Sequence, residues 1–465
     1  MFFCIKGCQA DGHDYAGAAA VKGAAAVVCS RDVELPEGSG AAVLLAEDTR
    51  KAMAAMAAAF YGWPDRRLVT VGITGTKGKT TTAYMVRSIL EEAGIRTGLV
   101  GTVEIYTGRE HIKSEYTTPD SIQLHGYLRD MADNGCQAAV VEVSSQALKL
   151  CRTDPICFDY GVFTNIEEDH ISPAEHRDFA DYAACKAKLF QRCGMGLVNG
   201  DDPNLGLITE KAACPLETFG FGPGNDLRAE SLCPVRLPGA LGSEFRVRGK
   251  GFDQDVILPM PGSFNCRNAL AAVSVCRKLG VPAETAARAL RRAAVPGRQE
   301  MFAIDPSRLV LVDYAHNGAG MYHLLQSLRE YRPSRLTCVF GCGGDRDPGR
   351  RQKMGEAAAR YADQIIITSD NPRNEAPQAI IRDIIEAVTK FETPFQVIED
   401  RGQAIERAVA GCQPGEIAVI CGKGHEDYQI LGNRKIHFDD REAVRASIEK
   451  VKHEQNYNWV DSGGH

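Results

Sequence analysis

The sequence lacks several features that would place it in a specialised class. No apolar run approaches the roughly 18 residues that a membrane-spanning helix needs. The segment from Met1 to Gly7 lacks the basic stretch and the longer apolar run of a signal peptide. There is no internal repeat, heptad pattern or low-complexity tract, and none of the 16 cysteines forms a C-x-x-C pair. These absences exclude a membrane-spanning protein, a coiled coil and a zinc-ribbon protein.

Charge and composition narrow the class further. Lys and Arg together number 54 and Asp and Glu 60, so the formal net charge is −6, which argues against general binding to nucleic acid or to anionic membranes. A small basic pocket for a phosphorylated ligand remains compatible with this charge. Scattered cysteines in a chain without a signal peptide favour free, buried thiols over a disulfide framework, so we expect a cytoplasmic protein. Apolar residues make up 44% and charged residues 25%, the ordinary mix of a globular protein.

The alternation of strand-like and helix-like segments indicates an α/β fold with mainly parallel sheets. A chain of 465 residues suggests about three domains at roughly 150 residues each. Interruptions at Pro64–Arg67 and Pro296–Arg298 place the predicted domains at residues 1–65, 66–297 and 298–465. The predicted strands are Leu68–Ile73, Ala138–Val143, Tyr160–Thr164, Leu309–Val312, Leu336–Phe340, Gln364–Thr368 and Ile417–Ile420.

Two further segments carry structural expectations. Residues 232–262 are rich in Pro, Gly and alternating residues, and we expect irregular β structure there, inside the second domain. The tail after Lys452 is polar and ends in Ser-Gly-Gly-His, so we expect it to be disordered.

The most specific local motif is a glycine-rich loop between a strand and a helix. Its residues are Gly75, Thr76, Lys77, Gly78, Lys79, Thr80 and Thr81. In this setting, backbone N–H groups and a helix N-terminus bind phosphates, a lysine neutralises phosphate charge and a threonine hydroxyl binds Mg²⁺. Ile73 stands where the common pattern has its first glycine, so the loop is a shortened variant. The alternative is a glycine-rich turn before a helix.

Acidic residues and a histidine follow two of the predicted strands. Glu142 ends the strand Ala138–Val143, and Asp169-His170 comes after the strand Tyr160–Thr164. Ligands gather at the carboxyl ends of parallel strands, so Glu142 is a candidate metal ligand beside the phosphate loop. His170 is a further candidate, which Asp169 would orient.

The run Thr74–Thr80 resembles the ATP loop of the Mur ligases, and further motifs of that family follow in order along residues 2–445. The resemblance implies an α/β protein with three domains: a small UDP-substrate domain, a central P-loop ATPase domain with a mainly parallel sheet, and a Rossmann-like C-terminal domain. It implies ATP and Mg²⁺ as cofactors, and carbamoylation of Lys186 by CO₂, which turns a cation into a metal-bridging anion. The implied catalytic residues are Lys79, Glu142, His170 and Lys186, and the implied metal ligands are Thr80, Glu142, His170 and carbamoylated Lys186.

The resemblance also implies binding residues for three substrates. For ATP these are the loop residues 75–81 together with Asn265, Arg298 and Asp313. For the UDP-muramoyl-dipeptide they are Cys8, Gln9, Ala10, Thr117, Thr118, Ser144 and Arg152. For the amino acid they are Arg346, Asp370, Asn371, Pro372, Arg373, Gly422 and Glu426. The Asp-Asn-Pro-Arg run matches the branch that adds meso-diaminopimelate, because a guanidinium can pair with the distal carboxylate that lysine lacks.

The family pattern has a further segment before Gly7, including an Asp-Ser-Arg run, which this sequence does not contain. We therefore expect a truncated first domain, with either a misassigned start or reduced UDP binding. An exposed, incomplete sheet edge of that kind would favour aggregation.

The sequence thus predicts an ATP-dependent ligase that joins meso-diaminopimelate to UDP-N-acetylmuramoyl-L-alanyl-D-glutamate through an acyl phosphate, acting as a monomer without nucleic-acid or membrane partners. One alternative is the same ligase with L-lysine or another amino acid. Others are a folylpolyglutamate-type ligase, a P-loop switch or transport ATPase, and a non-catalytic binding protein. A G-x-G-x-x-G dinucleotide motif is not complete at Gly341–Arg346, so NAD binding is disfavoured.

Overall fold

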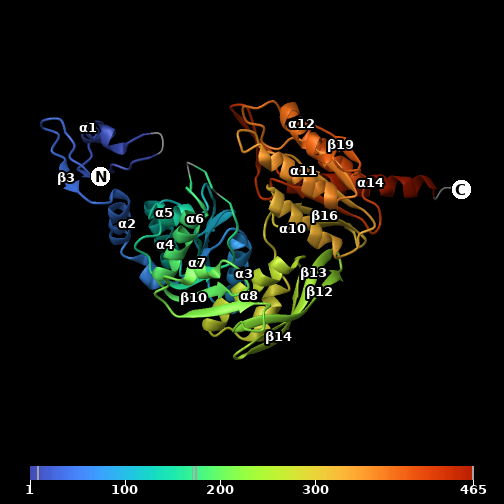
Figure 1. The fold of residues 1–465 in the computed structure, drawn as a ribbon, viewed down its shortest axis with the longest axis horizontal. Coiled ribbons are helices and arrows are strands. Elements are labelled where there is room, and N and C mark those ends of the chain that lie inside the picture. The colour runs from blue at the N-terminus through green and yellow to red at the C-terminus, as the bar shows by residue number, and fades with distance from the viewer. Residues whose placement is uncertain (8–9, 170, 173–174, 463–465) are drawn as a thin grey trace. The chain divides into compact units, whose positions relative to one another are not determined.

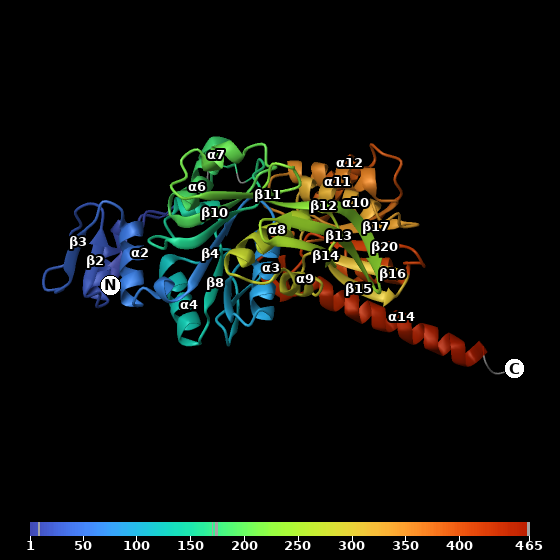
Figure 2. The same cartoon turned by 90° about the horizontal axis from the view of Figure 1, so that it is seen from below.

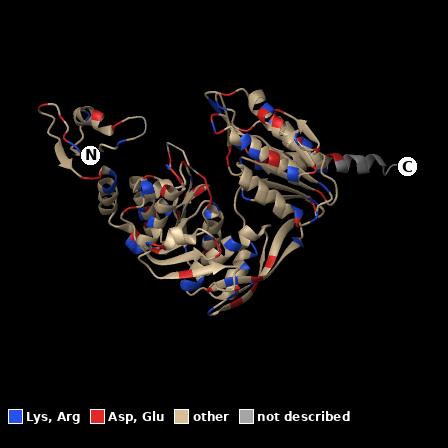
Figure 3. Cartoon of the chain, in the orientation of Figure 1, with Lys and Arg blue, Asp and Glu red and all other residues tan. Residues whose placement is uncertain are grey.

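The computed structural model of the chain describes residues 1–7, 10–169, 171–172 and 175–462, with side chains up to residue 454. The predicted site residues Cys8, Gln9 and His170 lie outside the described residues. The chain forms two compact units. The first comprises Met1–Ala229, Val247–Gln254 and Arg267–Ala289, and the second comprises Glu230–Arg246, Asp255–Cys266 and Leu290–His465. Segments of both charge signs occur in each unit (Figure 3).

The N-terminal part of the first unit is a small parallel sheet in the order β1-β2-β3. Its elements are β1 (Phe2–Phe3), η1 (Gly12–Tyr15), α1 (Ala16–Val21), β2 (Ala26–Cys29), β3 (Ala42–Leu45) and α2 (Thr49–Phe60). Asp48 caps α2 by accepting hydrogen bonds from the backbone N–H groups of Arg50 and Lys51. The start of α2 is therefore fixed by this aspartate.

The large sheet of the first unit surrounds β4 and runs in the order β11-β10-β9-β4-β8-β5-β6-β7. Neighbouring strands from β11 to β5 are parallel, so their carboxyl ends lie at one edge. The strands are β4 (Val69–Thr74), β5 (Thr97–Val100), β6 (Glu104–Tyr106), β7 (His111–Lys113), β8 (Ala138–Glu142), β9 (Phe158–Phe163), β10 (Cys193–Asn199) and β11 (Leu216–Gly220). Helices connect most of these strands (Figure 1): α3 (Lys79–Glu92), α4 (Ser121–Asp133), α5 (Ser145–Lys149), α6 (Phe179–Ala187) and α7 (Leu205–Thr209), with the short helix η3 (Lys188–Gln191). The short helix η2 (Pro64–Arg67) precedes β4, and α8 (Ser263–Lys278) and α9 (Ala283–Leu290) follow later in the chain.

The expectation of irregular β structure at residues 232–262 is wrong. Three regular strands, β12 (Leu227–Leu237), β13 (Ala240–Gly249) and β14 (Phe252–Leu258), lie next to one another in the sheet order (Figure 2). Two-residue turns join them, and Gly239 and Gly251 supply positive φ values of 70° and 74° there. Two of the glycines that suggested irregularity, Gly239 and Gly251, therefore lie in hairpin turns.

The second unit contains a doubly wound sheet in the order β15-β16-β20-β17-β18-β19, parallel except for β15. Its strands are β15 (Glu300–Asp305), β16 (Arg308–Asp313), β17 (Leu336–Phe340), β18 (Gln364–Ile367), β19 (Phe395–Val397) and β20 (Ile417–Cys421), with a separate hairpin of β21 (Tyr428–Leu431) and β22 (Arg434–His437). Its helices are α10 (Gly318–Arg329), α11 (Gly349–Tyr361), α12 (Pro377–Val388), α13 (Arg401–Ala410) and α14 (Asp440–Ser462).

Apolar side chains cover both faces of this sheet. Leu309 and Leu311 of β16 join one core cluster, which includes residues of α10, α11 and α12. Val310 joins the opposite cluster, which includes residues of α13 and α14. This alternation along one strand is the pattern of a parallel sheet buried on both sides. Each strand predicted from the sequence is a strand in the structure, with ends that agree within two residues.

The C-terminal tail differs from its prediction. α14 continues to Ser462, so the expectation of disorder directly after Lys452 is wrong. No glycine or proline interrupts the segment before Gly463, and the helix that begins at Asp440 therefore continues. Among the described residues, no helix is long and apolar enough to cross a membrane.

The cysteines of the described residues are all free, as the sequence predicted. Cys157 and Cys233 are exposed, Cys214 is half-buried, and the others are buried. The Sγ atoms of Cys193 and Cys214 lie 3.4 Å apart without a bond between them.

Candidate active site

The glycine-rich loop connects β4 to α3, as the sequence predicted. Gly75 and Gly78 have φ values of +152° and +84°, a region that glycine adopts most readily. A Cβ atom at Gly75 would lie 1.9 Å from the Thr164 hydroxyl, and one at Gly78 would lie 2.3 Å from Oδ1 of Asn268. No side chain among the described residues caps the N-terminus of α3. The N-terminus of this helix, with its positive dipole end, can therefore stabilise an anion.

Two lysines point to the same part of this loop. Lys79 Nζ donates to the carbonyl oxygens of Gly75 at 2.8 Å and Thr76 at 3.2 Å, and Lys186 Nζ donates to the Gly75 carbonyl at 2.9 Å. Lys186 is 1% exposed and lies 4.5 Å from the ring centroid of Tyr182. Burial, and then the charge of Lys79, hold the pKa of Lys186 well below its usual value. Burial therefore favours the uncharged form of the Lys186 amine.

Glu142 lies at the carboxyl end of β8, next to β4, and is fully buried. The Thr80 hydroxyl donates to its Oε2 at 2.9 Å. The backbone N–H of Thr102 donates to Oε1 at 2.9 Å, and the Thr102 hydroxyl donates to Oε2 at 3.0 Å. A Cβ atom at Gly101 would lie 2.3 Å from Oε1, so the backbone closes tightly around this carboxylate.

These contacts fit a magnesium ion. In the part of the chain that the structure describes, the groups hydrogen-bonded to the Glu142 carboxylate are two hydroxyls and one backbone N–H, all uncharged. A buried carboxylate is stabilised by a cation, and carboxylate and hydroxyl oxygens are the donors that Mg²⁺ prefers. Thr80 and Glu142 can therefore hold the ion that the sequence predicted.

The predicted UDP-substrate residues of this unit surround Glu142. Thr117 and Thr102 share a hydrogen bond of 3.0 Å between their hydroxyls. The Thr118 hydroxyl donates to the Glu142 carbonyl at 2.7 Å and accepts from the Ser144 backbone N–H at 3.1 Å. Arg152 Nη1 donates to the Thr118 carbonyl at 2.8 Å. The structure thus brings these side chains together beside the candidate metal site, whereas Ala10 is exposed in the N-terminal sheet region.

In the second unit, the predicted ATP residues form a connected group. Asn265 is 2% exposed, and its Nδ2 donates to Oε1 of Gln299 at 2.6 Å. The backbone N–H of Gln299 donates to Oδ2 of Asp313 at 2.8 Å. Burial raises the pKa of Asp313, an effect that Arg298 opposes, and the Arg298 guanidinium lies 4.3 Å from the Tyr314 ring centroid. Gln299 links the three predicted residues, although sequence reasoning missed it.

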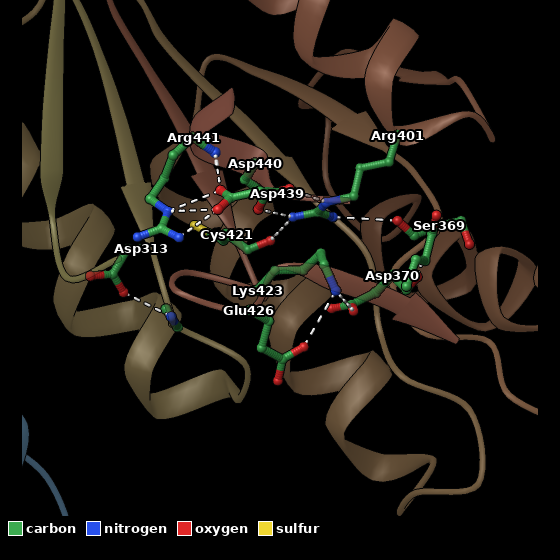
Figure 4. A network of polar contacts seen from close by, with 12 residues as sticks. Asp313, Ser369, Asp370, Arg401, Cys421, Lys423, Glu426, Asp439, Asp440 and Arg441 are labelled. Carbon is green, nitrogen blue, oxygen red and sulfur yellow. Dashed lines mark hydrogen bonds and ion pairs between the residues drawn. The ribbon is translucent and has the colours of Figure 1, made fainter. Parts of the chain in front are cut away.

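The predicted amino-acid residues follow the carboxyl ends of β18 and β20, except for Arg346, which lies in the loop after β17. Asn371 Nδ2 donates to Glu426 Oε2 at 3.0 Å. Lys423, which is fully buried, lies with its Nζ 3.3 Å from Glu426 Oε2, 3.4 Å from Asn371 Oδ1 and 3.8 Å from Asp370 Oδ1 (Figure 4). Burial raises the pKa of Glu426, and the Lys423 ammonium opposes this effect. The positive charge of Lys423 therefore partly neutralises the carboxylates of Asp370 and Glu426. Its position between two glycines in the sequence did not indicate this role.

Backbone geometry fixes the rest of this pocket. Arg373 has a φ of +53°, and its Nη1 donates to the Gly344 carbonyl at 2.7 Å. Gly422 has a φ of +117°, and a Cβ atom there would lie 2.7 Å from Asp370 Oδ2. Pro372 is buried, while Arg346 is exposed. The pocket therefore combines two fixed carboxylates with guanidinium groups, one of them exposed.

A buried ion pair connects the two strand ends that carry this pocket. Arg401 and Asp440 are both fully buried, and Arg401 Nε and Nη2 each lie 2.7 Å from a carboxylate oxygen of Asp440. Arg401 also donates to the carbonyls of Cys421 at 2.9 Å and Ser369 at 3.3 Å, which directly precede Gly422 and Asp370 (Figure 4). No local sequence signal indicates this pairing, because the partners come from α13 and α14.

The fold and these sites define a class of protein: a P-loop α/β enzyme with a phosphate loop and buried metal-binding carboxylate in one unit, and an acidic and basic pocket on a doubly wound sheet in the other.

Comparison with known proteins agrees with this class. Residues 1–61 match the Mur ligase family, catalytic domain, residues 73–276 the Mur ligase middle domain, and residues 297–424 the Mur ligase, glutamate ligase domain. UDP-N-acetylmuramoyl-L-alanyl-D-glutamate--2,6-diaminopimelate ligase 1 of Clostridium acetobutylicum is 39% identical over 455 residues, covering 97% of this chain and 92% of its own. The ligase of the same name, without the numeral, from Thermosynechococcus vestitus is 41% identical over 458 residues, covering 97% and 90%.

Solved structures give the same result. A UDP-N-acetylmuramoyl-L-alanyl-D-glutamate--2,6-diaminopimelate ligase superposes with a TM-score of 0.68 at 29% identity, covering 95% of this chain and 90% of the other. A folylpolyglutamate synthase of Mycobacterium tuberculosis has a TM-score of 0.65 at 19% identity, covering 81% and 93%, which shows a shared fold. The chain belongs to the Mur ligase family, and its fold is the three-domain α/β architecture expected from the sequence.

Proposed function

We propose that this protein joins meso-diaminopimelate to the D-glutamate carboxylate of UDP-N-acetylmuramoyl-L-alanyl-D-glutamate, with cleavage of ATP to ADP and phosphate. The observation that carries the proposal is the Asp370–Arg373 segment, fixed against Glu426 and Lys423 in a pocket that holds charges of both signs. Relatives that are 39–41% identical over nearly the whole chain carry the name of this activity.

The first step is phosphoryl transfer. The N-terminus of α3 and Lys79 bind the ATP phosphates, and Lys79 exchanges its loop carbonyl partners for phosphate oxygens. Thr80, Glu142, His170 and carbamoylated Lys186 would hold a Mg²⁺ ion, which would supply Lewis-acid stabilisation of phosphate charge. The D-glutamate carboxylate oxygen attacks the γ-phosphorus atom, the bond to ADP breaks, and an acyl phosphate forms.

Carbamoylation of Lys186 follows from its burial. The uncharged amine that burial favours attacks CO₂, an N–C bond forms, and one proton passes to water. The product is an anion in place of a potential cation next to the loop that binds phosphate. A negative charge is favourable for a ligand of Mg²⁺.

The second step is amide formation. The amino group of meso-diaminopimelate attacks the acyl carbon, a tetrahedral intermediate forms, and phosphate leaves with the electrons of the C–O bond. Closure of the amino-acid domain excludes the water that would otherwise hydrolyse the acyl phosphate. We assign no general base for the amine proton.

Three side chains of the amino-acid pocket have a proposed partner on the substrate. Arg373 pairs with the distal carboxylate, Glu426 with the distal ammonium, and Arg346 with the other carboxylate. Asp370, Asn371, Pro372 and Gly422 shape the pocket.

The remaining predicted residues bind the other two substrates. Thr117, Thr118, Ser144 and Arg152 bind the UDP-muramoyl-dipeptide, together with the Cys8–Ala10 segment. Asn265, Arg298 and Asp313 bind ATP. The cytoplasmic location and the monomeric state stay predictions.

A single competition assay tests the proposed function. The purified chain receives ATP, Mg²⁺, bicarbonate, UDP-muramoyl-dipeptide and equal amounts of meso-diaminopimelate and L-lysine, and mass spectrometry reads the products. We expect a diaminopimelate-bearing tripeptide as the main product. A lysine-bearing product would overturn the assigned amino acid, and ATP hydrolysis without any tripeptide would overturn ligation.

A further inference from the structure

A second group of metal-binding atoms lies outside the residues assigned above. A nitrogen of His176, an oxygen of Asp181 and the sulfur of Cys185 all lie within 4.8 Å of one another. Asp181 and Cys185 are four residues apart on α6 and so lie on one face of that helix. His176 precedes the helix, and its side chain is fully buried, while Cys185 is 4% exposed. Two of the three donors are therefore buried, and the third, the Asp181 carboxylate, is half-buried with a side chain that is 25% exposed.

The orientation of His176 is that of a metal ligand. Its Nε2 lies 2.9 Å from the Ser145 hydroxyl on α5, which packs beside α6. Its Nδ1 faces Asp181, 3.3 Å from Oδ2, and is buried without a hydrogen-bond partner of acceptable geometry within the described residues. Histidines that bind metals usually anchor one ring nitrogen in this way and present the other to the ion.

The distances between the donors already suit a tetrahedral ion. Zinc binds nitrogen and oxygen at about 2.0–2.2 Å and sulfur at about 2.3 Å, which places neighbouring donors roughly 3.3–3.6 Å apart. The observed separations are 3.3 Å between His176 Nδ1 and Asp181 Oδ2, and 3.9 Å between Cys185 Sγ and the other carboxylate oxygen, Oδ1. One donor atom of each residue lies within 4.8 Å of the other two, so side-chain rotations that shorten these separations would bring all three onto one ion.

A cation already lies against the carboxylate of this group. Lys149 Nζ is 2.8 Å from Asp181 Oδ2 and also donates to the Glu175 carbonyl at 2.8 Å. The Lys149 side chain is 37% exposed, so its ammonium can turn toward solvent when a metal ion replaces it. Lys149 therefore competes with metal at this position.

We propose that His176, Asp181 and Cys185 form a binding site for a thiophilic divalent cation of the Zn²⁺ class, with water as fourth ligand. Imidazole and thiolate donors select such ions over Mg²⁺, which prefers oxygen. On binding, an S–metal bond forms and the Cys185 thiol proton passes to water. The site is separate from the magnesium site, because Lys186 Nζ, next to Cys185 in the sequence, points instead to the Gly75 carbonyl. It does not depend on the proposed ligase activity.

Titration of the full chain with Co²⁺ as the probe tests this site. The background carries Cys157→Ser and Cys233→Ser, which removes the exposed thiols among the described cysteines. We expect one equivalent of Co²⁺ to bind with a thiolate-to-cobalt charge-transfer absorption, and Zn²⁺ to displace it. Cys185→Ala should abolish this absorption, and His176→Gln should weaken Co²⁺ binding at least tenfold.

Lys149→Met gives a test that does not depend on losing a buried ligand. Removing the competing ammonium should tighten Co²⁺ binding several-fold, and a melting curve of each metal-free variant checks its fold. An absorption that survives Cys185→Ala, as the Cys193 and Cys214 pair could produce, would overturn the assignment. So would the absence of any charge-transfer absorption, or weaker binding in Lys149→Met.

Discussion

The buried pair of Arg401 and Asp440 provides the most demanding test of the second unit. Asp440→Asn keeps the size of the side chain but leaves the guanidinium buried without its counter-ion. Burial alone would lower the pKa of Arg401, and in the native protein the Asp440 carboxylate outweighs this effect and raises it. A guanidinium is effectively always protonated in proteins, so Arg401 stays charged in the variant. Breaking a buried pair by removing one partner costs about 3–5 kcal/mol of the free energy of unfolding. For a unit of this size, that is a fall of roughly 6–20 °C in the melting temperature.

The same two helices offer a matched control. Lys450 of α14 and Glu406 of α13 form an ion pair at 3.0 Å with side chains that are 59% and 47% exposed. Glu406→Gln should cost no more than about 1 kcal/mol, because solvent screens an exposed pair. The double variant Arg401→Met/Asp440→Leu should recover at least half of the loss, since an apolar pair leaves no buried charge.

Calorimetry or circular dichroism on the full chain measures these melting temperatures. The assay also has a functional arm. Arg401 donates to the carbonyls of Ser369 and Cys421, so Asp440→Asn should raise the KM for the amino acid more than the KM for ATP. If the Asp440→Asn variant has the same melting temperature as the Glu406→Gln variant, the buried pair does not contribute the stability inferred for it.

The remaining predictions concern the loop, the buried lysine and the amino-acid pocket. Gly78→Ala should lower kcat/KM for ATP more than tenfold, because the new Cβ would meet Asn268, whereas Gly94→Ala, with a φ of +79° and open space around it, should leave that value nearly unchanged. Lys186→Met should nearly abolish ligation yet raise the melting temperature at neutral pH without bicarbonate. Because the pKa of Lys186 is lowered in the folded protein, the unfolded chain binds a proton at this lysine that the folded protein does not bind, and this difference destabilises the native protein. The increase in melting temperature on removing the lysine should therefore shrink as pH rises toward 10.5, where the unfolded chain also loses the proton. Melting curves across this range check the sign, and a gain that grows with pH would contradict it. Arg373→Lys should raise the KM for diaminopimelate far more than that for L-lysine in steady-state assays, and equal losses would count against the assigned carboxylate partner.

Local patterns in the sequence predicted the phosphate loop well. The strand Val69–Thr74, the loop glycines and the helix from Lys79 are contiguous, so each residue type reports on its own backbone conformation. The strand ends at Glu142 and Asp370 were also recognisable, because short β-branched runs precede them.

Contacts between distant segments were not predictable in the same way. Thr102 reaches Glu142 across 40 positions, Asn265 reaches Gln299 across 34, and Arg401 reaches Asp440 across 39. Each partner alone is an ordinary residue, and only the sheet order or the packing of two helices brings the pair together. His176 belongs to the same category, since its spacing to Cys185 matches no standard metal motif.

The distribution of free thiols gives this protein built-in reporters of local opening. A dilute alkylating reagent should modify Cys157 and Cys233 in the native state and reach the buried thiols only as the surrounding structure opens. Cys136 and Cys193 lie in a core cluster of the first unit, and Cys338 and Cys412 lie in the two clusters of the second. Mass-resolved labelling rates at these positions would therefore measure the stability of each unit separately, in one chain and without engineered cysteines.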